Sequence, residues 1–146
     1  MKHRWPFLLG MLFCLFSCSV EPISKPKMYF LAAGCDYANS PVQTLRGTIP
    51  DVKEMAACMQ NLAWSSGTDM SETVMMQEGP DREQTNLYPD AVTLRTRLQE
   101  FAAQTSSSAI FVLYFSGHGT SNNGDVSLAL AATDEVAYTT FPVSAV

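Results

Sequence analysis

Basic residues are scarce in this sequence. It holds 9 Lys and Arg against 14 Asp and Glu, and two of the nine, Lys2 and Arg4, stand at the extreme amino terminus. Without those two, 7 basic residues face 14 acidic ones, a net charge of −7. Proteins that bind nucleic acid or an anionic membrane surface need the opposite balance, because their lysines and arginines neutralise phosphate groups. The composition therefore excludes nucleic acid and anionic lipid headgroups from the expected partners.

Side-chain clusters that bind metals or phosphates are also missing. No His, Cys and Asp residues recur at the spacing of a metal site, and no glycine-rich loop has the pattern of a phosphate-binding loop. The sequence therefore predicts no metal and no cofactor. It contains no internal repeat or low-complexity tract, and its 146 residues suit one domain.

The amino terminus resembles a bacterial signal peptide. Residues 2–4 are basic, and the apolar run Trp5–Phe16 is too short for a permanent membrane anchor. Ser17 followed by Cys18 resembles the end of a lipobox, in which Cys18 would carry lipid as the first residue of the mature protein. An ordinary export signal and an uncleaved anchor are the alternatives.

This reading divides the chain into three parts. Residues 1–18 are the expected signal peptide, and residues 19–27, which contain two prolines, are the expected tether. Residues 28–146 form the expected domain. We expect the protein to be exported and to sit as a membrane-anchored lipoprotein that faces the periplasm or the cell surface. The membrane is then a partner only through the amino-terminal anchor.

The most apolar stretch of the domain is Ile110–Phe115. It is short, rich in β-branched and aromatic residues, and has no polar alternation, which favours a strand covered on both faces. We expect it in the middle of a mainly parallel sheet rather than at an edge. The run stops at residues 116–119, Ser-Gly-His-Gly. In open α/β sheets, ligands and chemistry gather beyond the carboxyl ends of the strands.

Strand and helix patterns alternate before this stretch. Met28–Ala33 is a first strand, and a helix follows for which Thr48 is the expected N-cap. Residues 73–76 are a weaker second strand, and a second helix should begin between Pro89 and Thr93. The order β-α-β-α-β with right-handed crossovers predicts a three-layer α/β/α sandwich with a mainly parallel sheet.

Three motifs in this order resemble the caspase and metacaspase superfamily of cysteine peptidases. Residues 30–37 resemble its first strand and the exit from that strand. Residues 45–52, Leu-Arg-Gly-Thr-Ile-Pro-Asp-Val, resemble the segment that opens its first helix. Residues 111–119 resemble its third strand with the Tyr-Ser-Gly-His-Gly terminus. The resemblance covers residues 28–146 and implies a caspase-like fold that stops before the fourth core strand.

The resemblance also implies roles for individual residues. His118 matches the histidine that serves the catalytic cysteine as general base, since an imidazole exchanges protons near neutral pH. Gly119 matches the residue that gives a backbone N–H to the oxyanion hole. Asp51 and Ser116 match residues that line a pocket for Arg or Lys in the substrate. Arg46 is the nearest counterpart of the arginine with which true caspases select aspartate.

The nucleophile of that family has no counterpart here, because it belongs after a fourth strand and no cysteine follows Cys58. The expected function is therefore a cysteine endopeptidase present as a fragment and acting on a protein or peptide. The alternative is an inactive caspase-like domain that binds another protein. Cys35 is the one candidate for a substitute nucleophile. Relatives are often calcium-dependent, but the acidic ligands would lie in the absent part.

Each of these residues also has a structural explanation. Asp51 at a helix start is explained by capping and by the helix dipole. His118 could cap a strand end through hydrogen bonds, and Arg46 could be a solvated loop charge. Cys35 could be a small buried apolar side chain, which is how free cysteine usually behaves.

Overall fold

The computed structural model describes residues 24–38, 40–77, 88–131 and 138–146. The predicted signal peptide with Cys18, and residues 19–23 of the tether, lie outside the described residues. Within the described part, no helix combines the length and hydropathy that a membrane span requires. The elements are β1 (Lys27–Cys35), α1 (Thr48–Ser66), β2 (Asp69–Gln77), α2 (Ala91–Gln104), β3 (Ile110–Ser116), β4 (Gly119–Asn122), β5 (Asp125–Leu130), β6 (Thr139–Pro142) and the short 3-10 helix η1 (Val143–Ala145).

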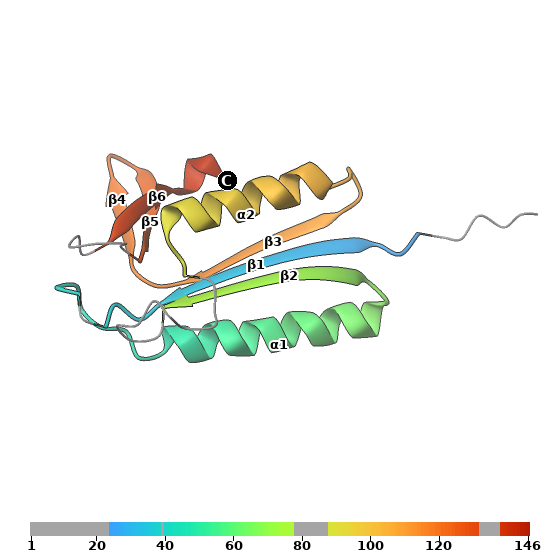
Figure 1. The fold of residues 1–146 in the computed structure, drawn as a ribbon, viewed down its shortest axis with the longest axis horizontal. Coiled ribbons are helices and arrows are strands. Elements are labelled where there is room, and N and C mark those ends of the chain that lie inside the picture. The colour runs from blue at the N-terminus through green and yellow to red at the C-terminus, as the bar shows by residue number, and fades with distance from the viewer. Residues whose placement is uncertain (1–23, 39, 78–87, 132–137) are drawn as a thin grey trace, which may run out of the picture.

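The main sheet is parallel and has the order β2-β1-β3. Figure 1 shows α1 on one face of this sheet and α2 on the other. The predicted α/β fold with three layers and a parallel sheet is therefore confirmed. The layers follow from the sequence because each helix has an apolar face that must be buried, and a parallel sheet offers two faces to cover.

The core is built on β1, whose successive side chains point to opposite faces. Tyr29, Leu31 and Ala33 pack with the α2 residues Leu94 and Phe101. The alternate residues Phe30 and Ala32 pack with α1, chiefly with Val52 and Ala56. Each large apolar side chain buried in this way contributes roughly 1.5–3 kcal/mol, so β1 holds the two helices onto one sheet.

Within the described residues, Ile110–Phe115 does not form the middle of the sheet, contrary to the expectation. Among the described strands, β3 pairs only with β1 and is an edge of the parallel sheet. Ile110 is 49% exposed and Phe111 37% exposed. The apolar run does form a strand, but hydrophobicity alone does not reveal how many neighbours a strand has. The central position belongs to β1, in which every residue from Met28 to Cys35 is buried.

The start of α1 also differs from the expectation. Thr48 is not the N-cap: it is the first residue of the helix and is buried, and its hydroxyl donates to the Leu45 carbonyl at 3.4 Å. Gly47 is the N-cap and offers no side chain to the free N–H groups. The Asp51 backbone N–H donates to the Gly47 carbonyl at 2.9 Å. The expected cap, in which the Thr48 side chain is the N-cap and Asp51 lies three residues later, is therefore not formed.

The second helix begins where the sequence predicts. Asp90 caps α2, since its carboxylate accepts from the Thr93 N–H at 2.8 Å and from the Thr93 hydroxyl at 3.0 Å. Leu94 and Phe101 are buried on the sheet side. Within the first turn this cap satisfies backbone donors that a helix leaves free.

A small antiparallel sheet with the order β4-β5-β6 follows β3. Figure 1 places it beyond the carboxyl ends of the parallel strands. Asn123 and Gly124 turn β4 into β5 with positive φ angles of 52° and 93°, a pair of conformations that suits a tight hairpin. The small sheet therefore adjoins the edge of the parallel sheet at which the predicted site residues lie.

Candidate active site

Two chain segments meet at the carboxyl edge of the parallel sheet. Gly34 near the end of β1 pairs with Ser116 at the end of β3. The segment that leaves β1 therefore runs beside residues 116–119. Gly117 keeps the two segments close, because a Cβ atom there would lie 2.6 Å from the Tyr37 hydroxyl oxygen. A contact under 3.0 Å would displace one segment, so this position requires glycine.

His118 lies at this edge and is partly exposed. Its Nε2 atom is 2.8 Å from the backbone carbonyl oxygen of Gln43. A carbonyl can only accept a hydrogen bond, so Nε2 carries the proton. In the neutral ring, Nδ1 is then the nitrogen with a free lone pair. The geometry thus gives His118 a defined orientation and one basic nitrogen.

Gly119 opens β4 and pairs with Leu128 on β5. The neighbouring Ala129 N–H donates to the His118 carbonyl at 2.9 Å, so residues 118 and 129 form the hydrogen-bonded type of antiparallel pair. Hydrogen-bonded and non-hydrogen-bonded pairs alternate along such a ladder. The Gly119 N–H therefore points away from β5, on the outer side of a strand that is at the edge of its described sheet.

Asp51 and Ser116 come together from different elements. Asp51 is in the first turn of α1, and Ser116 is the last residue of β3. The Ser116 hydroxyl donates to Asp51 Oδ2 at 3.0 Å. The carboxylate is exposed, so it retains acceptor capacity for a cationic group from outside. The two residues predicted to share a pocket thus share a hydrogen bond.

We compared the chain with models of known families. Residues 31–142 match the caspase domain, which is more than half of the chain. The chain belongs to the caspase domain family. A comparison with curated proteins gave no match.

In this caspase domain, Cys35 cannot act as a ready nucleophile. Its side chain is fully buried at the end of β1. Burial raises the pKa of the Cys35 thiol from 9.0 to about 12, and the nearby Asp36 carboxylate acts in the same direction. The thiolate is the reactive form of cysteine, so Cys35 stays an inert thiol near neutral pH. The structural explanation, a small buried side chain, fits Cys35 better than substitution for the missing nucleophile.

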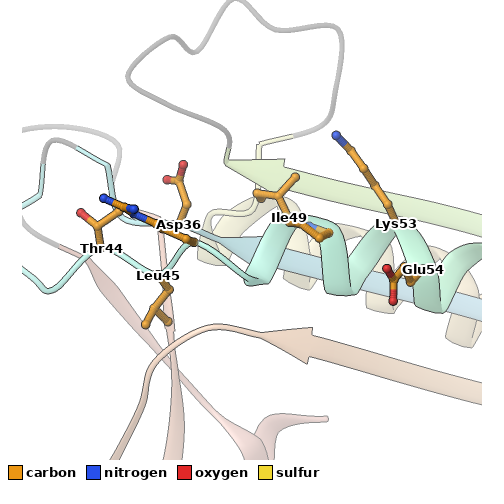
Figure 2. A pocket seen from close by; sticks show the side chains of 8 residues that line it. Asp36, Thr44, Leu45, Ile49, Lys53 and Glu54 are labelled. Carbon is orange, nitrogen blue, oxygen red and sulfur yellow. The ribbon is translucent and has the colours of Figure 1, made fainter.

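A cavity of about 540 Å³ adjoins the site, and Figure 2 shows side chains from α1 and from the segment before it around this space. Arg46 lines it together with Lys53, and the acidic side chains Asp36 and Glu54 also line it. Asp51 is not part of its wall. Arg46 therefore belongs to a space of mixed charge and not to the Asp51–Ser116 pair. The full lining is Asp36, Thr44, Leu45, Arg46, Ile49, Pro50, Lys53 and Glu54.

The described residues contain no cluster of His, Cys, Asp or Glu side chains of the kind that holds a metal ion. Nowhere in the described ranges do three His, Cys, Asp or Glu side chains gather closely enough to hold a metal. Calcium usually takes six to eight oxygen ligands, so one hydrogen-bonded carboxylate such as Asp51 is not a site.

Two residues of the site were missed by sequence reasoning. Gln43 acts through its backbone carbonyl, which leaves no side-chain signal in the sequence. Tyr37 lies under the His118 ring, with the two ring centroids 4.8 Å apart. A signal for Tyr37 did exist, because it ends the first of the three motifs and is an aromatic residue in a polar strand exit.

Proposed function

We propose that this chain is the amino-terminal part of a cysteine endopeptidase catalytic domain, with His118 as the general base. The observation that carries the proposal is the hydrogen bond of His118 Nε2 to the Gln43 carbonyl, which leaves Nδ1 basic beside an outward-facing Gly119 N–H. A base and an oxyanion donor on adjacent residues are what acyl transfer from a peptide requires.

In the proposed reaction, His118 Nδ1 takes the proton of a cysteine thiol, and the thiolate attacks the scissile carbonyl carbon. The Gly119 N–H donates to the oxygen on which negative charge develops. The imidazolium then gives its proton to the leaving amine as the C–N bond breaks. His118 next deprotonates water, which hydrolyses the thioester and releases the thiol. One oxyanion donor is worth about 3–4 kcal/mol in the transition state.

The cysteine would come from a further strand beside β3. The pairing of β3 supports this, since among the described strands only β1 pairs with it, and Ile110 and Phe111 at its start are exposed. A strand that pairs with β3 in parallel would end at the same edge as His118. Its carboxyl end is where a nucleophile could reach Nδ1.

Asp51 and Ser116 are proposed to set the substrate preference. An exposed carboxylate held by the Ser116 hydroxyl can pair with the guanidinium of arginine or the ammonium of lysine. We therefore propose cleavage after Arg or Lys rather than after Asp.

The test is to extend the chain by the codons that follow Val146 in the gene and to assay peptide reporters ending in Arg, Lys or Asp. We expect an additional cysteine and thiol-dependent cleavage after Arg and Lys. His118→Ala should lower kcat/KM by about 10²- to 10⁴-fold. His3→Ala removes the only other histidine and should change nothing. A cysteine-containing extension that leaves the chain inactive would contradict the proposal.

A second candidate is a caspase domain that does not cleave and instead binds a basic protein segment through its acidic surface. It is favoured by the burial of Cys35, the one candidate for a substitute nucleophile. A stop codon directly after Val146 would favour this function over proteolysis.

A further inference from the structure

Tyr37 occupies an unusual position at the exit of β1. Its side chain is fully buried, and its backbone has a positive φ of 58°. That conformation is uncommon for a residue with a bulky side chain. The hydroxyl accepts a hydrogen bond from the His118 backbone N–H at 2.8 Å and donates one to the Ala129 carbonyl. It thus contacts both His118 and Ala129, the pair that directly precedes the Gly119–Leu128 pair of the β4–β5 ladder.

In an ordinary hydrogen-bonded pair, two residues exchange both N–H···O bonds directly. Here one bond is present, from the Ala129 N–H to the His118 carbonyl at 2.9 Å. The second would run from the His118 N–H to the Ala129 carbonyl, and the Tyr37 hydroxyl lies between these two groups instead. We propose that Tyr37 is a positioning residue that holds His118 away from β5 by inserting its hydroxyl into the ladder.

Tyr37 also acts on the imidazole ring. The two rings are in contact, tilted by 43°. The Tyr37 carbonyl accepts from the Ser40 N–H at 3.0 Å, which forms the turn that leads to Gln43. Gln43 in turn accepts from His118 Nε2. Tyr37 therefore contacts both the backbone and the ring of His118. It also forms the turn before Gln43, whose carbonyl fixes the tautomer of the His118 ring.

The hydroxyl can play this part over a wide pH range. Burial raises the pKa of Tyr37 above its ordinary value, and the neighbouring Cys35 adds to the effect. The hydroxyl therefore remains protonated, and it continues to donate to Ala129 while it accepts from His118.

The inference rests on the proposed function, since orienting His118 matters because that residue is the proposed base. The test does not require activity. In Tyr37→Phe, the His118 N–H loses its acceptor and can close onto the Ala129 carbonyl. The matched control is Tyr29→Phe, because Tyr29 is equally buried and its hydroxyl donates to a backbone carbonyl, that of Gln104, at 2.8 Å.

The measurement is NMR of the chain labelled with ¹⁵N-histidine. The chain contains only two histidines, so the signals are simple to assign. In the unsubstituted chain we expect a protected His118 amide and a ring protonated at Nε2 when neutral. Tyr37→Phe should shift the His118 amide signal and move both ring nitrogens toward tautomer-averaged values. Tyr29→Phe removes one hydrogen bond to a backbone carbonyl and should leave all of these signals unchanged.

An unchanged His118 spectrum in Tyr37→Phe would overturn the inference and leave the proposed peptidase function intact. If that variant does not fold, the unsubstituted chain can still test the inference. We then expect a nuclear Overhauser effect between the His118 amide proton and a slowly exchanging Tyr37 hydroxyl proton. A His118 amide that exchanges as fast as exposed loop amides would refute it. A failed cleavage assay with the expected NMR result would instead refute the peptidase function alone.

Discussion

The two strands that lead into the candidate site are alike in sequence and unlike in surroundings. β1 and β3 are both apolar, both are parallel, and they pair with each other from Met28 and Ile110 onward. Every residue of β1 after Lys27 is buried, whereas β3 is exposed at its start and half-buried elsewhere. Among the described strands, β1 is therefore paired on both sides, whereas β3 is paired on one side only. The proposed mechanism needs another strand on the other side of β3.

The largest expected effect concerns the stability of the fold and is tested with one pair of leucines. Leu31 on β1 and Leu113 on β3 are register partners, and both contact the cluster under α2. Leu31→Ala should lower the free energy of unfolding by about 2–5 kcal/mol, because the cavity lies in a fully packed site. Leu113→Ala should cost roughly half as much, since its side chain is already partly hydrated. Urea unfolding measures both, and equal losses would show that β3 is as well covered as β1.

A second test compares the exits of the two strands. A Cβ at Gly34 would lie 2.8 Å from Val52 Cγ2, and one at Gly117 would lie 2.5 Å from Phe115 Cζ. We expect Gly34→Ala and Gly117→Ala each to cost about 1–3 kcal/mol, as overpacking does. Gly34→Ala should displace α1 and with it Asp51, whereas Gly117→Ala should displace Tyr37 and His118. Changes in amide chemical shifts distinguish the two variants. If both variants shifted the same amide signals, the two glycines would not act on different segments.

Much of the fold was predictable because it depends on local patterns. Helical spacing of apolar residues locates α2, and apolar runs locate the parallel strands. The order of those strands was not predictable from hydrophobicity, because a run such as Ile110–Phe115 looks the same at an edge and at the centre. The N-cap was also missed, since Thr48 has the preferred side chain but the chain geometry places Gly47 there.

The candidate site also contains residues that the sequence predicts and one that it does not. His118, Gly119, Asp51 and Ser116 were predicted from residue identity and motif order, and the structure brings Asp51 and Ser116 into direct contact. Gln43 contributes only a carbonyl, which every residue has. Its role depends on where the segment after β1 folds back, and no sequence pattern specifies that.

The two cysteines of the described residues extend the comparison to the pH dependence of stability. Cys35 at the end of β1 is buried and Cys58 on α1 is exposed. Burial raises the pKa of Cys35 from 9.0 to about 12, so between these values the unfolded chain releases a proton that the folded chain keeps. Stability is therefore complete below pH 9 and falls as the pH rises toward 12, by up to about 1.4 kcal/mol per pH unit. Tyr37, whose pKa burial also raises, acts in the same direction.

Urea unfolding of variants between pH 7 and pH 10.5 checks the part played by Cys35. Cys35→Ala should flatten the alkaline fall in stability, and Cys58→Ala should leave it unchanged. Alkylation provides a second readout: iodoacetamide should modify Cys58 in the native chain and reach Cys35 only after unfolding. Rapid native alkylation of Cys35 would show that the end of β1 is open to solvent.

The smallest expected effect concerns the free side of β3. Unpaired strand edges with apolar side chains promote association between chains, and a lysine at such an edge opposes it. Ile110→Lys places a charge at the exposed start of β3 and should reduce concentration-dependent association of this chain in sedimentation velocity. Val92→Lys is the control, because Val92 is 74% exposed but lies on the helix α2 and not on a strand. If both lysines reduce association equally, added charge is the cause, and the free side of β3 is not the surface through which chains associate.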